Sequence, residues 1–352
     1  MKPSRLTWDT LDWSALDRLR DTFLAGKPTG GSYWTSSSDL ANYDLTFAQR
    51  IGWKWDAVLR ELRMRDWTPS GDSLLDWGCG SGIAGRRVVE FFGAGRFKST
   101  RVFDRSPLAM EFAAEKARQA FPDLQIESVG TEVFSTIAGG APSRFSVKDA
   151  PIGTLIVSHV LNELDEAGWQ ALRERIDHAD AVLWVEPGTY ADSRSLIAMR
   201  ETLRASFNVI APCTHQCDCG LRASNHERHW CHHFASPPPG IMADSNWVRF
   251  AKRAGIDLRS LPYSFLVLER KGLRDPVAGL LPEGYSRVVG HPRFYKGYAK
   301  IFSCQAEGVR DLTLQKRDAP EMFKALGKSQ ASPFQKWILK NGRIESVETP
   351  PG

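Results

Sequence analysis

Between residues 73 and 207, short apolar runs alternate with segments whose apolar residues are spaced as in helices. The runs include SLLDWG, STRVFD, GTLIVSHVL and AVLWVEPG, and helical patterns such as SGIAGRRVVEFFG and PLAMEFAAEKARQAF lie between them. Strands that alternate with helices of this length are typical of a parallel, doubly wound sheet. The alternation therefore predicts an α/β fold.

Helical spacing also marks residues 10–24 and 39–65, ahead of the alternation. At the other end, residues 285–317 have the pattern of antiparallel strands. A length of 352 residues agrees with more than one domain. The predicted parts are an N-terminal helical region, the alternating domain with a cysteine-rich insertion, and a small basic β-rich module: 1–70, 71–272 with the insertion at 212–240, and 273–352.

The motif LDWGCGSG ends one predicted strand and opens the next helix. Gly78, Gly80 and Gly82 let the backbone turn tightly and approach a ligand, and the helix N-terminus offers free N–H groups. Asp104 ends the next predicted strand, where a carboxylate can accept hydrogen bonds from ribose hydroxyls. These residues, together with Asp76, predict a nucleotide-cofactor site.

Two cofactors suit this site. A loose G-x-G-x-x-G match through Gly80, Gly82 and Gly85 would suit an NAD oxidoreductase. The D-x-G-x-G-x-G form, and D-R-S-P-x-A-M from Asp104 onward, instead resemble the S-adenosylmethionine site of class I methyltransferases. The second resemblance covers more residues, so we expect S-adenosylmethionine and a class I methyltransferase sheet.

Catalytic candidates follow the next predicted strands. SHVLNEL closes the fourth strand, where class I methyltransferases place residues near the methyl group, and it supplies His159, Asn162 and Glu163. Glu186, in WVEPGT, ends the fifth. The alternative is that these groups only cap helices and turns. No N-P-P-Y or D-P-P-Y motif is present, so the catalytic residues stay unassigned.

The stretch PCTHQCDCGLRASNHERHWCHHFA contains four of the six cysteines and five of the eight histidines. In a reducing compartment such a stretch more often binds metal than forms disulfides. Four thiolates suit an iron–sulfur cluster, and three thiolates with one histidine suit tetrahedral zinc. Spacing leaves both open, along with a metal-free loop. The histidines available to zinc are His215, His226, His229, His232 and His233.

Five segments together resemble the methyltransferase-like assembly factors of the mitochondrial small ribosomal subunit and their bacterial relatives. They are LDWGCGSG, SHVLNEL, VEPGT, the A-P-C-x-H-x-x-x-C pattern and WCHHF, and the similarity runs from about 73 to 317. The resemblance implies a class I methyltransferase fold, binding to the small subunit or its rRNA, and a 4Fe-4S cluster. It fits either an rRNA methyltransferase or a non-catalytic ribosome-binding factor, with a zinc-containing RNA methyltransferase as a further alternative.

The resemblance also implies the cluster ligands. The family pattern maps onto Cys213, Cys219 and Cys231, with Cys304 in KIFSC as the fourth. Cys217 departs from that pattern and is the alternative second ligand.

Charge favours a polyanionic partner. Residues 287–343 hold twelve Lys and Arg against four Asp and Glu, an excess larger than the net +5 of the whole chain. Phe294, Tyr295, Tyr298 and Trp337 are interleaved with these charges and are candidate stacking surfaces. We therefore expect this segment to contact rRNA.

The sequence favours a cytoplasmic, bacterial protein without a membrane partner. No apolar run approaches the ~20 residues that span a bilayer, and the N-terminal segment lacks a signal peptide's apolar core. Asp9, Asp12, Asp17 and Asp21 argue against a mitochondrial presequence, which is poor in acidic residues. We expect the protein to be a monomer.

Overall fold

The computed structural model describes residues 6–25, 33–129 and 151–348. The predicted N-terminal region includes 1–5 and 26–32, which lie outside the described residues. The chain divides into two compact units. The first consists of Met1–Leu59, Pro69–Val185 and Ala235–Leu261, and the second of Arg60–Thr68, Glu186–Phe234 and Pro262–Gly352. The three predicted domain boundaries stay a prediction.

The N-terminal region folds into α1 (Trp13–Leu24), α2 (Ser37–Leu45) and α3 (Phe47–Met64). The single helical pattern over 39–65 is therefore divided. Thr46 breaks it, with φ −123° and ψ −91°, and its hydroxyl donates to the carbonyl of Asn42 at 2.7 Å. A side chain that bonds its own backbone in this way competes with helix continuation.

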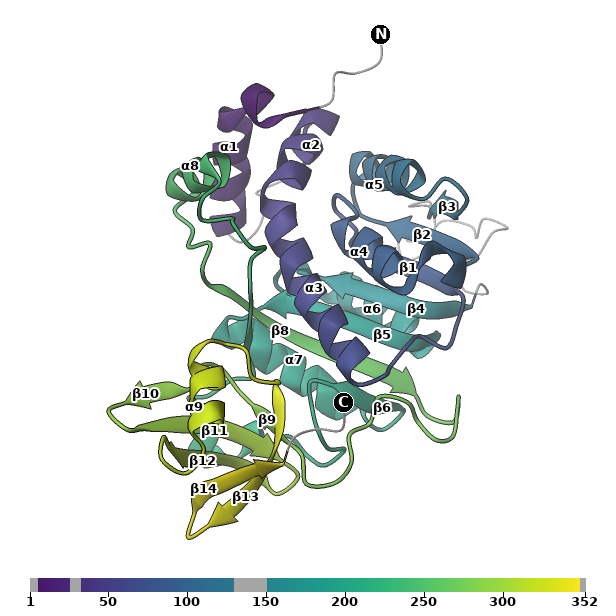
Figure 1. The fold of residues 1–352 in the computed structure, drawn as a ribbon. Helices are drawn as coiled ribbons and strands as arrows, with labels where there is room; N and C mark the ends of the chain where they lie inside the picture. Colours follow the sequence, from purple (N-terminus) through teal and green to yellow (C-terminus); the bar gives the residue numbers. More distant parts are fainter. Residues whose placement is uncertain (1–5, 26–32, 130–150, 349–352) are drawn as a thin grey trace. The chain divides into compact units, whose positions relative to one another are not determined.

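The predicted alternation is confirmed. In chain order the elements are β1 (Ser73–Trp77), α4 (Ile83–Phe92), β2 (Ser99–Phe103), α5 (Pro107–Ala120), β3 (Gln125–Ser128), β4 (Ile152–Ser158), α6 (Glu166–Asp177), β5 (Ala179–Pro187), α7 (Tyr190–Leu203), β6 (Phe207–Ala211), β7 (His233–Ala235), α8 (Ser245–Ala254) and β8 (Leu261–Arg270). In the first unit, α4 and α5 lie against β1, β2 and β3, and α6 lies against β4 (Figure 1).

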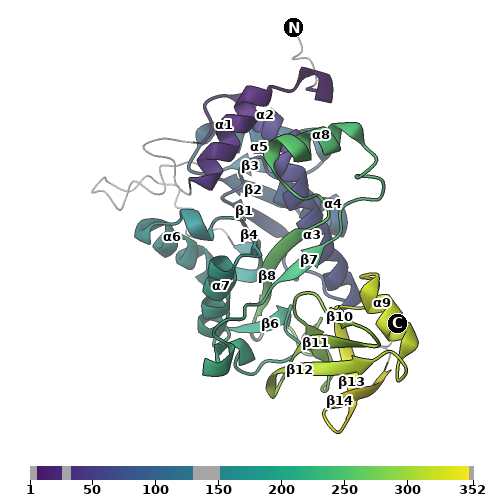
Figure 2. The same ribbon diagram turned by 90° about the vertical axis from the view of Figure 1, so that its left-hand side faces the viewer.

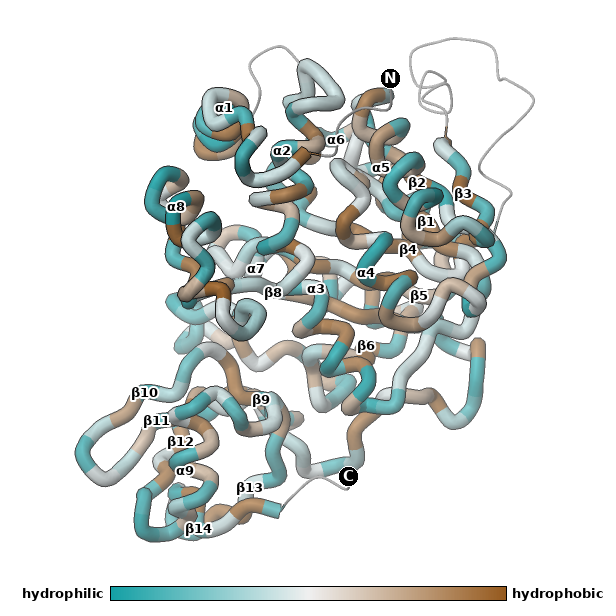
Figure 3. The backbone as a smooth tube through the Cα atoms, turned by 45° about the horizontal axis from the view of Figure 1, so that its top comes forward, coloured by the Kyte–Doolittle hydropathy of each residue, from teal (hydrophilic) through white to brown (hydrophobic). Residues whose placement is uncertain are grey.

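The strand order of this sheet is β3-β2-β1-β4-β5-β8-β6, with β7 paired to β8. Strands β1 to β5 pair in parallel, whereas β6 and β8 are antiparallel. Every residue of β4 except the last is buried. The hydropathy colouring of Figure 3 shows apolar stretches near β4. This order, with one antiparallel strand inserted near the edge, is that of class I S-adenosylmethionine-dependent methyltransferases. The predicted fold class is confirmed.

The C-terminal part of the second unit is a closed barrel. Its elements are β9 (Ser286–Val288), β10 (Arg293–Tyr295), β11 (Tyr298–Gln305), β12 (Gly308–Gln315), α9 (Pro320–Gly327), β13 (Phe334–Lys340) and β14 (Arg343–Glu348). The pairing runs β11-β12-β14-β13-β9, and β9 also pairs with β11, so the ring closes. Figure 2 shows β10 to β14 and α9 together. The β12–β14 pair is parallel, and α9 lies between the third and fourth ring strands in sequence. This connectivity is that of an OB-fold.

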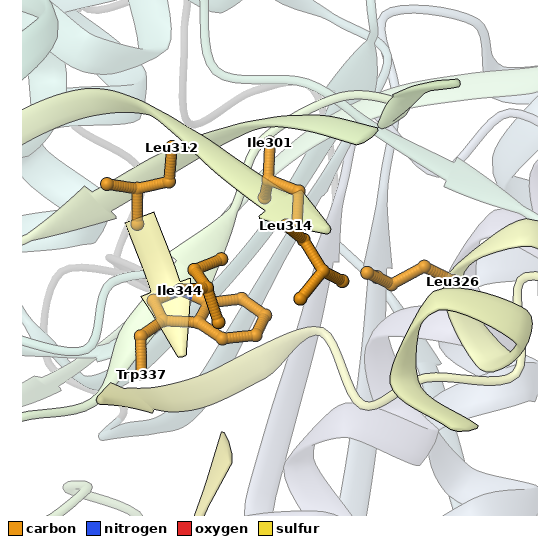
Figure 4. Close-up of a cluster of buried hydrophobic side chains, with 6 residues drawn as sticks. All are labelled: Ile301, Leu312, Leu314, Leu326, Trp337 and Ile344. Atoms are coloured by element: carbon orange, nitrogen blue, oxygen red, sulfur yellow. The ribbon is translucent and has the colours of Figure 1, made fainter. Parts of the chain in front are cut away.

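Trp337 lies in the core of the barrel, where it packs with Ile301, Leu314 and Ile344 (Figure 4). Its indole N–H donates to the Ser303 hydroxyl at 3.0 Å. The expectation that Trp337 offers a stacking surface is therefore wrong: the sequence pattern after residue 317 was too weak to show β13, whose inner face holds this ring.

Candidate functional site

The loop after β1 has the backbone that its glycines predict. Gly78, Gly80 and Gly82 have φ of +73°, +51° and +77°, in the left-handed region that favours glycine. Gly82 directly precedes α4 and makes no side-chain cap bond there. The first amides of α4 therefore lack a capping side chain from this position, as an anion- or ligand-binding helix N-terminus requires.

The three glycines differ in what surrounds them. A Cβ at Gly78 would lie 2.6 Å from Val160 Cγ1, and one at Gly82 would lie 2.8 Å from Ala113 Cβ. A Cβ at Gly80 would meet no atom of the described residues within 4 Å. Packing thus requires the first and third glycines, while Gly80 faces open space that a ligand could occupy.

Asp104 holds this loop. Its Oδ2 accepts from the Gly80 N–H and its Oδ1 from the Ser106 N–H, each at 2.9 Å. Burial raises the pKa of Asp104, although both amides act in the opposite direction. Each carboxylate oxygen keeps a further lone pair, so hydroxyl donors can still bind.

Asp76 lies beneath the same loop. Its Oδ2 accepts from the Gly85 N–H at 3.0 Å, and its buried Oδ1 has no hydrogen-bond partner among the described residues. Burial raises the pKa of Asp76 to about 7. An unsatisfied buried oxygen of this kind is common at functional sites rather than in ordinary cores.

Arg86 ties the loop to the N-terminal helices. Its guanidinium donates to the Ser81 carbonyl at 2.7 Å and to Asp44 Oδ1, on α2, at 2.5 Å. Sequence reasoning missed both Arg86 and Asp44, because nothing in a single sequence pairs positions so far apart.

Glu163 lies within electrostatic range of Asp104. Burial, and then the charge of Asp104, raise its pKa to about 7, while a hydrogen bond from the Tyr33 hydroxyl opposes the shift. Asn162, by contrast, is exposed. Of these two candidates, the structure therefore places Glu163 near the glycine loop. Tyr33 of the N-terminal region, which the sequence did not suggest, donates a hydrogen bond to it.

His159 has an unusual backbone for a residue with a side chain, with φ of +58°. Its N–H donates to the Val185 carbonyl at 2.9 Å, and its Nε2 lies 3.5 Å from Lys54 Nζ. Burial, and then the charges of Lys54 and Arg50, hold its pKa well below the usual value. Burial and these two cations therefore favour the neutral imidazole and oppose its protonation.

Glu186 belongs to the second unit, where it is fully buried near the end of β5.

The second unit also holds five of the six cysteines, all except Cys79 of the glycine loop. Cys219 and Cys304 are buried, Cys213 and Cys231 are partly buried, and Cys217 is exposed. Desolvation raises the pKa of Cys304 most, and the charges of the other three family-pattern cysteines raise it further. Desolvation, and then the charges of Cys213 and Cys219, also raise the pKa of Cys231. The structure thus places the four family-pattern thiols within electrostatic range of one another.

Neighbouring side chains add further groups to this cysteine cluster, by which we mean Cys213, Cys219, Cys231 and Cys304. Cys304 Sγ lies 3.7 Å from His215 Nε2, and Cys231 Sγ lies 3.6 Å from His233 Nε2. Burial, and then the charge of Arg200, lower the pKa of His215 to about 4.

Arg200, on α7, organises the loop that carries Cys213. Its Nε donates to Cys213 Sγ at 3.2 Å, and its Nη2 donates to the Cys217 carbonyl at 2.8 Å. Arg200 thus fixes the position of Cys213 and of the chain that follows it. No local sequence pattern pointed to Arg200.

The four thiols of the cysteine cluster are chemically suited to bind a metal group. Four thiols without a carboxylate are what iron–sulfur clusters and all-cysteine zinc sites use. Within the described ranges, no three His, Cys, Asp or Glu side chains meet at the spacing of ligands to one ion. Thiolates on a single zinc lie about 4 Å apart because each Zn–S bond is about 2.3 Å, whereas a cubane cluster separates its ligands more widely.

Comparison with known proteins identifies the family. The family model described as mitochondrial small ribosomal subunit Rsm22 matches residues 47–331. The chain belongs to the Rsm22 family. The resemblance noted from the sequence is thereby confirmed, and the match includes both the glycine loop and all four residues of the cysteine cluster. The comparison with curated proteins gave no match.

Solved structures similar to this Rsm22-family chain include two that contain SAH. Magnesium protoporphyrin IX methyltransferase from Synechocystis PCC 6803, with bound SAH, is 13% identical, and the match covers 75% of this chain and 97% of that one, with a TM-score of 0.36. TrmK from M. capricolum, also in complex with SAH, is 8% identical. The match covers 62% of this chain and 70% of that one, with a TM-score of 0.31. At these scores the likeness carries no weight, and the strand order itself establishes the fold class.

The description of the Rsm22 family is mitochondrial, so the expected cytoplasmic location stays a prediction. Among the described residues, no helix combines the length and apolar character needed to cross a bilayer.

Proposed function

We propose that this Rsm22-family chain binds S-adenosylmethionine and acts, as a methyltransferase-like protein, in assembly of the small ribosomal subunit. The observation that supports this most is the glycine loop. Three glycines have left-handed backbone, Gly80 faces open space, and Asp104 accepts from the Gly80 amide. The family description supplies the small subunit as partner, and either its rRNA or a particle that contains it would be bound.

In this proposal the chain's own groups hold the cofactor. The Gly78–Gly82 loop and the first turn of α4 receive it, and Asp104 accepts hydrogen bonds from the ribose hydroxyls. S-adenosylmethionine supplies an electrophilic methyl group when bound. His159 directly follows β4, and Glu186 lies near the end of β5. We propose cofactor binding and assign no residue to methyl transfer.

Calorimetry with S-adenosylmethionine and the purified full chain tests the cofactor assignment. Asp104→Asn should weaken binding about 5- to 150-fold, which corresponds to the roughly 1–3 kcal/mol of a charge-assisted hydrogen bond. Asp123→Asn, an exposed carboxylate ahead of β3, is the matched control and should bind as wild type does. Absence of binding by folded wild-type protein would refute the cofactor assignment, and equal affinities for the two variants would refute the role of Asp104.

We also propose that the cysteine cluster holds a 4Fe-4S cluster through Cys213, Cys219, Cys231 and Cys304. Support comes from the mutual electrostatic influence of the four thiols, from the exposure of Cys217, and from the Arg200 N–H on Cys213. The cluster would be structural. It would join the segment after β6 to β11, and so shape the RNA-binding surface of the barrel.

A further inference from the structure

The outer face of β10, β11 and β12 is set by their register. Tyr298 of β11 pairs with Tyr295 and Gln315, and Lys300 pairs with Arg293 and Thr313. Directly paired residues point to the same side of a sheet, and successive residues alternate between sides. The intervening residues Ala299 and Ile301 are fully buried inside the barrel. Tyr298 and Lys300 therefore lie on the outer face, as do Phe302 and Cys304.

One end of this face is covered. The Phe302 ring lies 4.5 Å from the His229 ring and 5.7 Å from the His226 ring, centroid to centroid. Cys304 follows on the same face and belongs to the cysteine cluster. The cysteine segment thus occupies the end formed by the second half of β11.

The other end is open and aromatic. The rings of Tyr295 and Tyr298 stack with centroids 4.8 Å apart and planes at 11°. Tyr295 is 48% exposed at the tip of the β10–β11 hairpin, and Lys296 beside it is also exposed. A stacked pair with an accessible outer ring offers a flat surface on which an unpaired base can continue the stack.

A row of four cations and one threonine crosses the same face and continues around the barrel. Thr313 pairs with Arg343 of β14, and Arg343 pairs with Lys340 of β13, so the register extends the row that begins at Arg293 and Lys300. The row is Arg293, Lys300, Thr313, Arg343 and Lys340 across five strands. All five side chains are exposed or partly exposed. Such a line of charge can follow the phosphates of an extended strand.

Acidic neighbours only partly neutralise the row. Arg293 pairs with Asp311 at 2.7 Å and Lys340 with Glu345 at 3.0 Å, in exposed salt bridges that contribute little and that phosphate can replace. Lys300 and Arg343 form no salt bridge within the described residues.

We propose that this open end, which we call the tyrosine platform, binds single-stranded RNA. A base stacks on Tyr295, and the backbone phosphates follow the row from Lys300 to Arg343. The platform lies on the second and third ring strands and the hairpin before them, the region with which OB-folds bind oligonucleotides. Paired bases hide their faces in a duplex, so stacking selects single strands. The inference rests on the proposed association with the small subunit and names the site and the class of RNA bound.

Of the four stacking residues expected from the sequence, only two belong to the tyrosine platform. Phe294 is 42% exposed, but it points to the opposite side of β10 from Tyr295 and meets the Phe323 ring of α9 edge-on, at 5.2 Å and 90°. Together with the burial of Trp337, this leaves Tyr295 and Tyr298 as the stacking pair.

Fluorescence anisotropy of the full-length protein tests the platform, with a labelled single-stranded RNA of about 12 nucleotides as the probe, within the site size of one OB-fold. Tyr295→Ala should weaken binding about 5- to 100-fold, whereas Tyr295→Phe keeps the ring and should bind nearly as wild type does. The Lys300→Gln, Arg343→Gln double variant should reduce the slope of log affinity against log salt by about 1 to 2. The control is Lys324→Gln on α9 combined with Lys328→Gln directly after it, which removes the same charge from the same barrel away from the row.

The outcomes separate this inference from the proposed function. Equal affinity for a duplex of the same sequence, wild-type binding by Tyr295→Ala, or an equal change of slope in the α9 control would overturn the platform. Sedimentation of the same proteins with small ribosomal subunits provides the second measurement. Wild-type protein that sediments with the subunit but does not bind the single strand overturns the platform alone. Single-strand binding without sedimentation overturns the proposed function and leaves the platform supported.

Discussion

At the scale of single residues, the first unit concentrates acidic groups whose pKa is raised. Asp76, Asp104 and Glu163 are all buried or partly buried around the glycine loop, and desolvation is the largest cause of the shift in each. Their close placement disfavours ionisation, which costs stability at neutral pH. Clusters of this kind are typical of functional sites, where a ligand later supplies the missing donors.

Replacing Glu163 by Gln should raise stability at high pH only. The carboxyl of Glu163 has a folded pKa of about 7 against the usual 4.5, so the folded state binds the proton more tightly and the free energy of unfolding falls as pH rises through this window. The glutamine of the variant does not titrate, so the free energy of unfolding of the variant does not fall for this reason. It should match wild type near pH 4.5 and be more stable at pH 8 by on the order of 2 kcal/mol.

Urea unfolding of the two proteins at pH 4.5, 6 and 8 measures this difference. Glu115→Gln, an exposed change on α5, controls for the loss of one negative charge. A difference between Glu163→Gln and wild type that is the same at all three pH values would contradict the buried-carboxyl explanation.

At the scale of elements, the end of α3 connects parts of the second unit through charge. Glu61 forms ion pairs with Arg65 and with Arg287 of β9, and all three side chains are buried. Arg65 also donates to the carbonyls of Ile210 at 2.7 Å and Pro212 at 2.9 Å, directly before Cys213. Although burial opposes it, the charges of Arg287 and Arg65 hold the pKa of Glu61 below its usual value.

Glu61→Gln should destabilise the second unit strongly. Removing the carboxylate leaves two guanidinium groups buried without their counter-charge, and breaking a buried pair in this way costs about 3–5 kcal/mol. Chemical unfolding followed by tryptophan fluorescence measures the loss, with the exposed Glu90→Gln on α4 as control. A loss below about 1 kcal/mol would mean that the carboxylate contributes little to this network.

These connections also show what the sequence could predict. Strands and helices between 73 and 207 were predictable because apolar spacing is a local property, and the glycine loop because its backbone restricts residue choice. The ring closure of β9 with β11, and the contacts of Arg200 and Tyr33, depend on residues distant in sequence that no local pattern pairs. The cysteine ligands came from the family resemblance and not from spacing.

At the scale of the whole molecule, the cysteine cluster belongs entirely to the second unit, whereas the glycine loop belongs to the first. Cys231 and Cys304 have 72 residues between them, so a metal group that binds both closes a long loop. Closing a long loop removes many conformations from the unfolded chain, and metal-binding free energy adds directly to folding. Loss of the metal group should therefore destabilise the barrel more than the cofactor loop.

Cys304→Ser tests this directly. Anaerobically purified wild-type protein should be brown, with about four iron and four sulfide per chain, as a 4Fe-4S cluster requires. Cys304→Ser should be colourless, and hydrogen exchange in β11 and β12 should become faster, while affinity for S-adenosylmethionine, measured by calorimetry, stays close to wild type. Cys217→Ser should stay brown because Cys217 is exposed and does not belong to the family pattern of ligands. Colour lost in Cys217→Ser but kept in Cys219→Ser would make Cys217 the second ligand, and colourless wild-type protein with one tightly bound zinc would replace the iron–sulfur assignment by a zinc site.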